Sequence, residues 1–121
     1  MNVLIVEGQS DLGVVWQRHL ERQGMQVTLV SGQEDAIRHL AQHPTDVIVL
    51  NLVLEEGAAL AVSDYANYRV PNACVVFVTN TTFFSDGSIF AHCANARAFL
   101  PSDTAPEDLA AMIEHYGAGA S

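Results

Sequence analysis

Short apolar runs alternate along this chain with segments of helical length, and this alternation limits the possible folds more than any other feature. The runs are rich in valine, leucine and isoleucine, which is typical of strands buried on both faces of a parallel sheet. We expect strands at 3–6, 26–30, 46–50, 73–79 and 98–100. Amphipathic or capped segments after them predict helices at about 10–23, 31–42, 57–68, 84–94 and 104–116.

The order of these elements predicts the fold class. Consecutive parallel strands need a crossover connection, and a helix that makes the crossover packs onto the sheet in a right-handed sense. The expected fold is therefore α/β: a flavodoxin-like, doubly wound, five-stranded parallel sheet of the (βα)5 type, covered on both faces as a three-layer sandwich. A chain of 121 residues suffices for one such core. We expect one domain at 1–117 and a flexible tail at 118–121.

Helical spacing also indicates which side chains face the core. The first helix is expected to turn inward a face that carries Leu12, Val15, Trp16, His19 and Leu20. Gly24 should end this helix, because glycine readily adopts the left-handed backbone of a C-terminal cap. The last helix is expected to bury Leu109, Met112, Ile113 and Tyr116.

The charge of the chain argues against several classes of partner. Fourteen acidic residues stand against five arginines, no lysine is present, and the formal net charge is −9. Nucleic acids and anionic membrane surfaces require basic counter-charge, so we expect neither as a partner. No apolar stretch approaches the length of a membrane span and no basic segment precedes the first strand, which predicts a cytoplasmic protein without a signal peptide.

The side chains that most often bind transition metals show no binding pattern in the sequence. Cys74 and Cys93 lack the spacing of a metal site and are expected to be reduced thiols. The histidines at 19, 39, 43, 92 and 115 are spread over several helical segments. We expect them at surface or helix-end positions.

Polar residues follow several predicted strands at the C-terminal edge of the sheet, where open α/β sheets bind their ligands. We expect Glu7, Asn51, Thr79 and the segment after Leu100 to lie at this edge. An aspartate at position 51 could accept a phosphoryl group or bind a metal ion. Asn51 is neutral and its amide nitrogen is not a nucleophile, because the lone pair is delocalised. These positions predict the fold of a phosphorylation switch that lacks the residue able to accept the phosphoryl group.

The order of these positions resembles the receiver domain of two-component response regulators, over essentially the whole chain. The first strand ends in an acidic residue, Glu7, and the fourth ends in Thr79. Residues 46–54 match the phosphoacceptor strand of the family and its loop, position by position. Residues 95–102 are similar to the fifth strand and the turn that follows it. As an ordered set, these matches indicate the receiver fold.

The resemblance implies the parts of a phosphorylation pocket. In the family, two acids after the first strand and an aspartate after the third hold Mg²⁺, and a lysine after the fifth strand pairs with that aspartate. A threonine or serine after the fourth strand binds the phosphoryl group, and an aromatic residue on the fifth strand turns inward in response. The resemblance places these parts at Glu7 and Gly8, Asn51, Ser102, Thr79 and the switch aromatic Phe99.

Three of these positions depart from the family pattern. Gly8 removes one acid, Asn51 removes the phosphoacceptor, and Ser102 removes the lysine. Mg²⁺ usually requires one or two carboxylates together with phosphate, so Glu7 alone is a weak metal candidate. We therefore predict a degenerate receiver in a bacterial phosphorelay context, with no enzymatic activity, no cofactor and no bound metal. It would act by phosphorylation-independent protein–protein interaction.

The expected partner surface combines the fourth and fifth predicted helices with the fifth strand, the face that receivers commonly use. It carries a set of large apolar residues, Phe84, Ile89, Phe90 and Phe99. The crowding at the start of the fourth helix exceeds what one helix face usually buries, so the surplus favours an interaction patch. A signalling protein or a second copy of the chain would bind there.

Two alternatives remain open at this point. The vacated pocket at the C-terminal edge of the sheet could bind a metabolite, which would make the protein a small-ligand sensor. Glu55 or Glu56, in the loop beyond Asn51, could also lend a carboxylate to a metal ion bound by Glu7. That arrangement would predict a residual metal-dependent enzyme.

Overall fold

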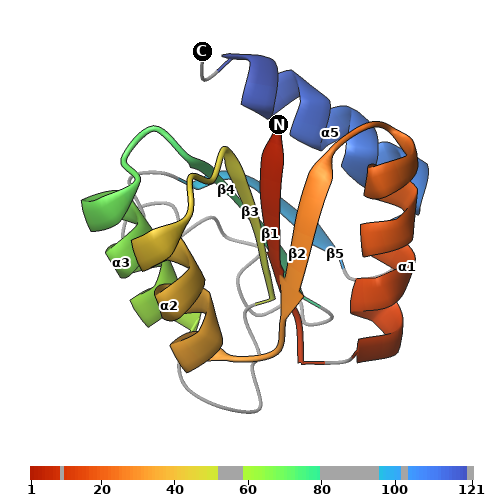
Figure 1. Cartoon of the computed structure of the whole chain (residues 1–121). Coiled ribbons are helices and arrows are strands. Elements are labelled where there is room, and N and C mark those ends of the chain that lie inside the picture. The colour runs from red at the N-terminus through yellow and green to blue at the C-terminus, as the bar shows by residue number, and fades with distance from the viewer. Residues whose placement is uncertain (9, 52–58, 80–95, 102–103, 120–121) are drawn as a thin grey trace.

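The computed structural model describes residues 1–8, 10–51, 59–79, 96–101 and 104–119 (Figure 1). Strands and helices alternate from residue 2 to residue 79, and a strand and a helix follow within 96–119. The strands are β1 (Asn2–Val6), β2 (Gln26–Val30), β3 (Val47–Asn51), β4 (Cys74–Thr79) and β5 (Ala96–Pro101). The helices are α1 (Ser10–Arg22), α2 (Gln33–Gln42), α3 (Ala59–Arg69) and α5 (Pro106–Gly119).

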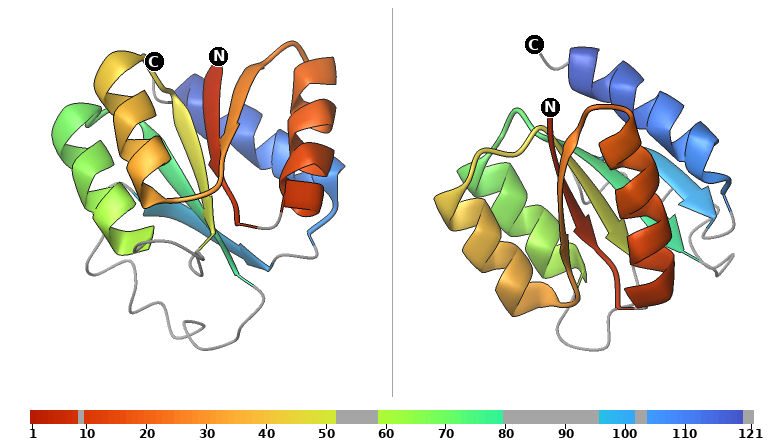
Figure 2. Two further views of the ribbon diagram at one scale, coloured as in Figure 1. Left: turned by 60° about the horizontal axis from the view of Figure 1, so that its bottom comes forward. Right: turned by 45° about the vertical axis from the view of Figure 1, so that its right-hand side comes forward.

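All strand pairs are parallel, and the strands form a five-stranded sheet in the order β2-β1-β3-β4-β5. Helices α1 and α5 cover one face, while α2 and α3 cover the other (Figures 1 and 2). The chain runs outward from β1 to β2 and then returns to β3, so the direction of winding reverses between β1 and β3. The α/β class and the flavodoxin-like, doubly wound arrangement predicted from the sequence are confirmed. Ligands of such sheets bind at this reversal, beyond the C-terminal strand ends.

The core consists of two layers, one on each face of the sheet. Successive residues of a strand point to opposite faces, and in β1 Leu4 contributes to one layer while Ile5 contributes to the other. The layer beneath α2 and α3 includes Leu40, Ile48, Val62 and Phe77. The layer beneath α1 and α5 includes Trp16, Leu20, Val49, Leu109 and Ile113. Because central strands are apolar on both faces, they predict this three-layer packing.

The inward face of α1 differs from the expectation at one position. Trp16 and Leu20 are buried as predicted, but Val15 is 51% exposed, so its predicted burial was wrong. The helix lies so close to β2 that a Cβ atom on Gly13 would be 2.6 Å from Cδ1 of Leu29. This close approach centres the buried face on Gly13 and Trp16, which turns Val15 toward solvent.

Other boundaries shift by a few residues. Helix α2 begins at Gln33 rather than at residue 31, and β5 is longer than predicted because its pairing with β4 continues to Pro101. Helix α5 continues to Gly119, beyond the predicted end at residue 116, and Leu109 and Ile113 are buried as expected. The helix predicted at 84–94 lies outside the described residues. Among the helices that are described, none combines the length and apolar character needed to cross a membrane.

Gly24 ends α1 through a two-bond C-terminal cap. The Gly24 N–H donates to the Glu21 carbonyl oxygen at 3.0 Å, and the Met25 N–H donates to the Leu20 carbonyl oxygen at 3.3 Å. Gly24 has a φ of +89°, in the left-handed region that glycine tolerates best. Leu20 and Met25 are both buried in the layer beneath α1, which is the apolar contact that usually accompanies this cap. The predicted role of Gly24 is confirmed.

Replacing Gly24 with alanine is expected to lower the free energy of unfolding by about 1–2 kcal/mol. No atom lies within 4 Å of the position that the new Cβ would take, so the cost comes from the backbone alone. Urea unfolding followed by circular dichroism would measure the loss. Gly24→Asn should lower the free energy of unfolding by less than Gly24→Ala, because asparagine tolerates the left-handed region. Equal losses for the two variants would show that backbone strain is not the cause.

Candidate functional site

The candidate site lies where the winding of the sheet reverses. Val6 and Leu50 are partners in the β1–β3 pairing, so Glu7 and Asn51 come directly after them on adjacent strands. Asn51 is itself paired with Val78 of β4, which places Thr79 at the same edge of the sheet. Two polar residues separated by 44 positions in the sequence are thereby brought side by side.

Glu7 and Asn51 are joined by a short hydrogen bond. The amide Nδ2 of Asn51 donates to the carboxylate Oε2 of Glu7 at 2.7 Å, a distance typical of a bond to a charged acceptor. The Glu7 side chain is buried, with 1% of the residue exposed, while Asn51 is partly buried. The Glu7 backbone N–H donates to the Val30 carbonyl oxygen at 3.0 Å, which continues the β1–β2 ladder beyond Val6. The carboxylate is therefore held by both its backbone and Asn51.

This arrangement has a clear electrostatic consequence. An aspartate at position 51 would place a second negative charge against Glu7, and the pair would need a proton or a cation. Asn51 instead donates an N–H group to the carboxylate, so the contact is favourable without a bound proton or cation. The Asn51 N–H group points at Oε2 of Glu7. A metal ion bound between the two side chains would need that oxygen as a ligand. The two residues therefore fit Mg²⁺ poorly.

The remaining predicted pocket residues are placed to different degrees. Gly8 follows Glu7 at the same edge and supplies no carboxylate. Thr79 is the last residue of β4, and Phe99 pairs with Phe77 through the β5 backbone. The structure therefore brings Glu7, Gly8, Asn51 and the backbone of Thr79 to one edge.

Several predictions fall on residues that the structure does not describe. Ser102, predicted to stand at the lysine position, is one of them. The others are Phe84, Ile89 and Phe90 of the expected partner surface, together with Glu55 and Glu56 of the metal alternative. These assignments remain predictions.

A pair of histidines that the sequence did not predict as a site lies at the opposite, N-terminal edge of the sheet. The rings of His39 and His43 stack with centroids 4.7 Å apart and an interplanar angle of 28°. Burial lowers the pKa of His39 below its usual value, and repulsion from His43 lowers that pKa further. The signal in the sequence was their spacing of four residues, which places two side chains on one side of a helix.

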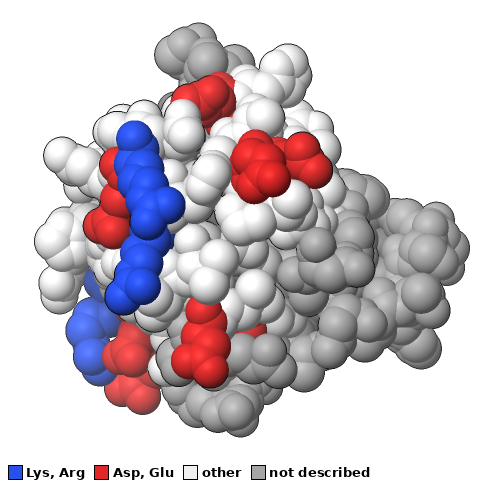
Figure 3. Space-filling view, turned by 90° about the vertical axis from the view of Figure 1, so that its right-hand side faces the viewer, with Lys and Arg blue, Asp and Glu red and all other residues white. Residues whose placement is uncertain are grey.

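Charged side chains are intermixed on the described surface. Figure 3 shows the side of the molecule that carries α1 and α5, where arginine and acidic side chains lie next to one another and a large area is uncharged. On α2, Arg38 contacts Glu34 at 3.0 Å and Asp35 at 3.3 Å. On the face seen in Figure 3, the blue arginine side chains form a narrow row with acidic side chains beside it.

Comparison with known proteins identifies the fold. No protein-family model matches the sequence, and no curated protein matches it. Among solved structures, a response regulator receiver domain protein (CheY-like) from Methanospirillum hungatei JF-1 superposes with a TM-score of 0.89 at 18% identity, covering 98% of this chain and 94% of that chain. The non-phosphorylated HemR receiver domain from Leptospira biflexa gives a TM-score of 0.84 at 18% identity, covering 96% of this chain and 93% of that chain.

A third similar structure is a response regulator protein from Burkholderia pseudomallei with a phosphorylated aspartic acid, a calcium ion and citrate. It gives a TM-score of 0.80 at 16% identity, covering 98% of this chain and 69% of that chain. These similarities confirm the receiver-domain fold that the sequence predicted. At such low identity they establish the fold alone, so the chemistry must be inferred from the residues of this chain.

Proposed function

We propose that this protein is a degenerate receiver module that signals through protein–protein contacts without aspartyl phosphorylation. The observation that carries the proposal is the 2.7 Å hydrogen bond from Asn51 to the buried Glu7 carboxylate. This hydrogen bond lies where the family resemblance places the phosphoacceptor and its metal ion. A bacterial phosphorelay context and a cytoplasmic location form part of the proposal.

The chemistry of the described residues supports this proposal. The Asn51 amide nitrogen is no nucleophile, and its N–H group is engaged by Glu7. Gly8 adds no second acid. The chain contains no lysine, so no lysine ammonium group is available at position 102 or elsewhere to pair with transferred phosphoryl oxygens. An acceptor, one metal-binding acid and the neutralising cation are therefore all missing together.

The proposed output surface is the face that carries α5 and β5, together with the segment 84–94. Strand β5 forms one edge of the sheet, so this side of the molecule is not covered by a further strand within the described sheet. We propose that a signalling protein or a second copy of the chain binds there, with Phe84, Ile89, Phe90 and Phe99 as the apolar contacts. With no phosphoryl group to bias the conformation, binding of the partner itself would select the active state.

A small-ligand sensor is the second candidate function. The observation that favours it is a buried carboxylate and an amide at the reversal point, where doubly wound sheets bind ligands. Thermal-shift screening with metabolites separates the two candidates. Saturable stabilisation that is lost in Glu7→Gln would favour the sensor, whereas no metabolite would stabilise a pure interaction module.

The wild-type protein is expected to remain unmodified when incubated with acetyl phosphate and Mg²⁺. The physical reason is the absence of a nucleophile at position 51. Intact-mass spectrometry provides the measurement, and a receiver with an aspartate at the acceptor position, treated in parallel, shows that the reagent is active. A stable gain of one phosphoryl group that disappears in Asn51→Ala would contradict the proposal. A gain that survives Asn51→Ala would locate the modification elsewhere.

A further inference from the structure

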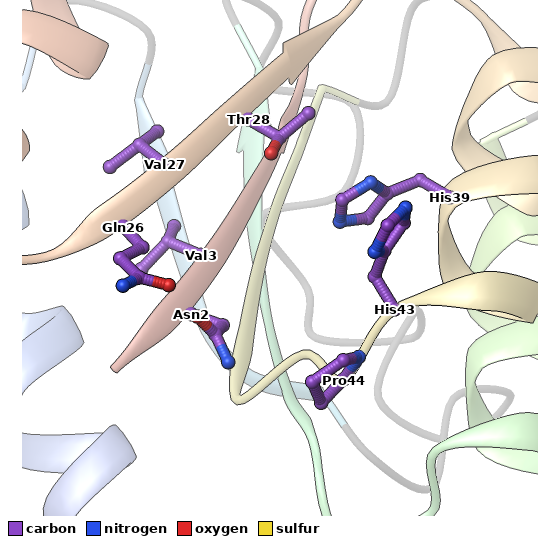
Figure 4. A pocket seen from close by; sticks show the side chains of 8 residues that line it. All are labelled: Asn2, Val3, Gln26, Val27, Thr28, His39, His43 and Pro44. Carbon is purple, nitrogen blue, oxygen red and sulfur yellow. The ribbon is translucent and has the colours of Figure 1, made fainter.

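A cavity of about 440 Å³ lies at the N-terminal edge of the sheet, on the opposite side from Glu7 and Asn51. It opens between the C-terminal end of α2 and the first residues of β1 and β2, where Asn2 pairs with Gln26 (Figure 4). Its lining consists of Asn2, Val3, Gln26, Val27, Thr28, His39, His43 and Pro44. The charged groups of the candidate site take no part in it.

The two histidines of this cavity are held one helical turn apart. The His43 backbone N–H donates to the His39 carbonyl oxygen at 2.9 Å, which is the regular helical bond even though His43 itself has the extended backbone of a cap. Figure 4 shows both rings turned from α2 toward the strands. Their centroids are 4.7 Å apart and their planes differ by 28°, so the two imidazoles stack against each other, and both line the cavity.

Neutral imidazole is a good ligand for zinc, nickel and copper ions, and a helix can present two imidazoles to one ion when they are four residues apart. His43 is exposed, so its ring can rotate to turn a nitrogen toward the ion that His39 binds. The net charge of −9 also favours binding of cations.

We propose that His39 and His43 chelate one divalent transition metal ion of the Zn²⁺, Ni²⁺ or Cu²⁺ class at the mouth of this cavity. Within the described ranges no group of three or more histidine, cysteine or acidic side chains could hold a metal. Water therefore fills the remaining coordination positions, beside the polar side chains of Asn2, Gln26 and Thr28. Such a two-ligand site is open and exchangeable, in contrast to closed structural zinc sites with four protein ligands.

The test is a titration of the metal-free, full-length chain with ZnCl2, NiCl2 and CuCl2 in separate experiments. Calorimetry should show saturable binding of one ion per chain, and the melting temperature should rise with metal concentration because the folded state binds the ion. His39→Gln and His43→Gln should each weaken binding at least about tenfold, because each removes one of two chelating ligands. His115→Gln is the matched control, because His115 lies on α5 outside the cavity, and it should bind like the wild type.

Two results would overturn the proposal: no saturable binding of any of the three ions, or binding that persists in both His39→Gln and His43→Gln. If a variant fails to fold, the wild-type protein still decides the question. Bound Ni²⁺ or Cu²⁺ should then broaden the ring-proton NMR signals of His39 and His43 before those of the other histidines. Uniform broadening of all five histidines would count against the site. Failure here leaves the proposed receiver function unaffected, since that rests on Glu7 and Asn51.

Discussion

Asn51→Asp is expected to destabilise the folded protein in metal-free buffer and to make its stability depend on Mg²⁺. The substitution places a second carboxylate where the Asn51 amide now lies 2.7 Å from Glu7 Oε2. Two like charges about 4 Å apart repel by about 4 kcal/mol at an effective dielectric constant near 20. Side-chain movement and proton uptake will relieve part of this, so we expect a loss of about 2–3 kcal/mol near pH 8. The loss should shrink as the pH falls, because one carboxyl can then bind a proton.

Urea unfolding in EDTA and in Mg²⁺, followed by the fluorescence of Trp16, would measure this effect. Asn72→Asp is the matched control, since it makes the same charge change at an exposed turn position. The control should change stability by less than about 0.5 kcal/mol and show no response to Mg²⁺. Equal stability of Asn51→Asp and wild type in EDTA would contradict the expected repulsion between Glu7 and residue 51.

The double variant Glu7→Gln/Asn51→Asp gives a sharper test of the same contact. It restores one amide and one carboxylate with the charge moved to position 51, so the stability lost in Asn51→Asp should largely return and the Mg²⁺ dependence should disappear. A double-mutant cycle over the four proteins isolates the coupling between the two side chains. Purely additive effects would mean that Glu7 and residue 51 do not interact.

Trp16→Ala is expected to have the largest effect on stability, a loss of about 3–5 kcal/mol. Trp16 is 1% exposed and packs beneath α1 with Leu20 and Ile113. Removing the indole takes away a large buried apolar surface and leaves a cavity that the surrounding strands cannot close. Because the variant lacks the only tryptophan, circular dichroism must follow its unfolding.

Val15→Ala provides the comparison from the same helix. Val15 precedes Trp16 but is 51% exposed, so its truncation should change stability by less than about 0.5 kcal/mol. Similar losses in the two variants would show that α1 does not pack through the face centred on Gly13 and Trp16. The pair thus tests whether α1 turns Trp16, and not Val15, toward the core.

Much of the fold was predictable because its signals are local. The run from Val47 to Leu50 is buried throughout, as expected for a central parallel strand. The cap at Gly24 was visible from a single residue, since a left-handed cap strongly favours glycine. Polar residues at strand ends also predicted which edge of the sheet carries Glu7 and Asn51. Each of these features depends on near neighbours in the chain.

The sequence by itself therefore determined the alternating elements, the parallel sheet and the neutral amide at position 51. Only the tertiary structure decided the hydrogen bond from Asn51 to Glu7, the outward turn of Val15 and the cavity that faces His39 and His43. The physical reason is that these features depend on distances between segments far apart in the chain. Strand register and the close contact of Gly13 with Leu29 set those distances, and local periodicity carries no information about either.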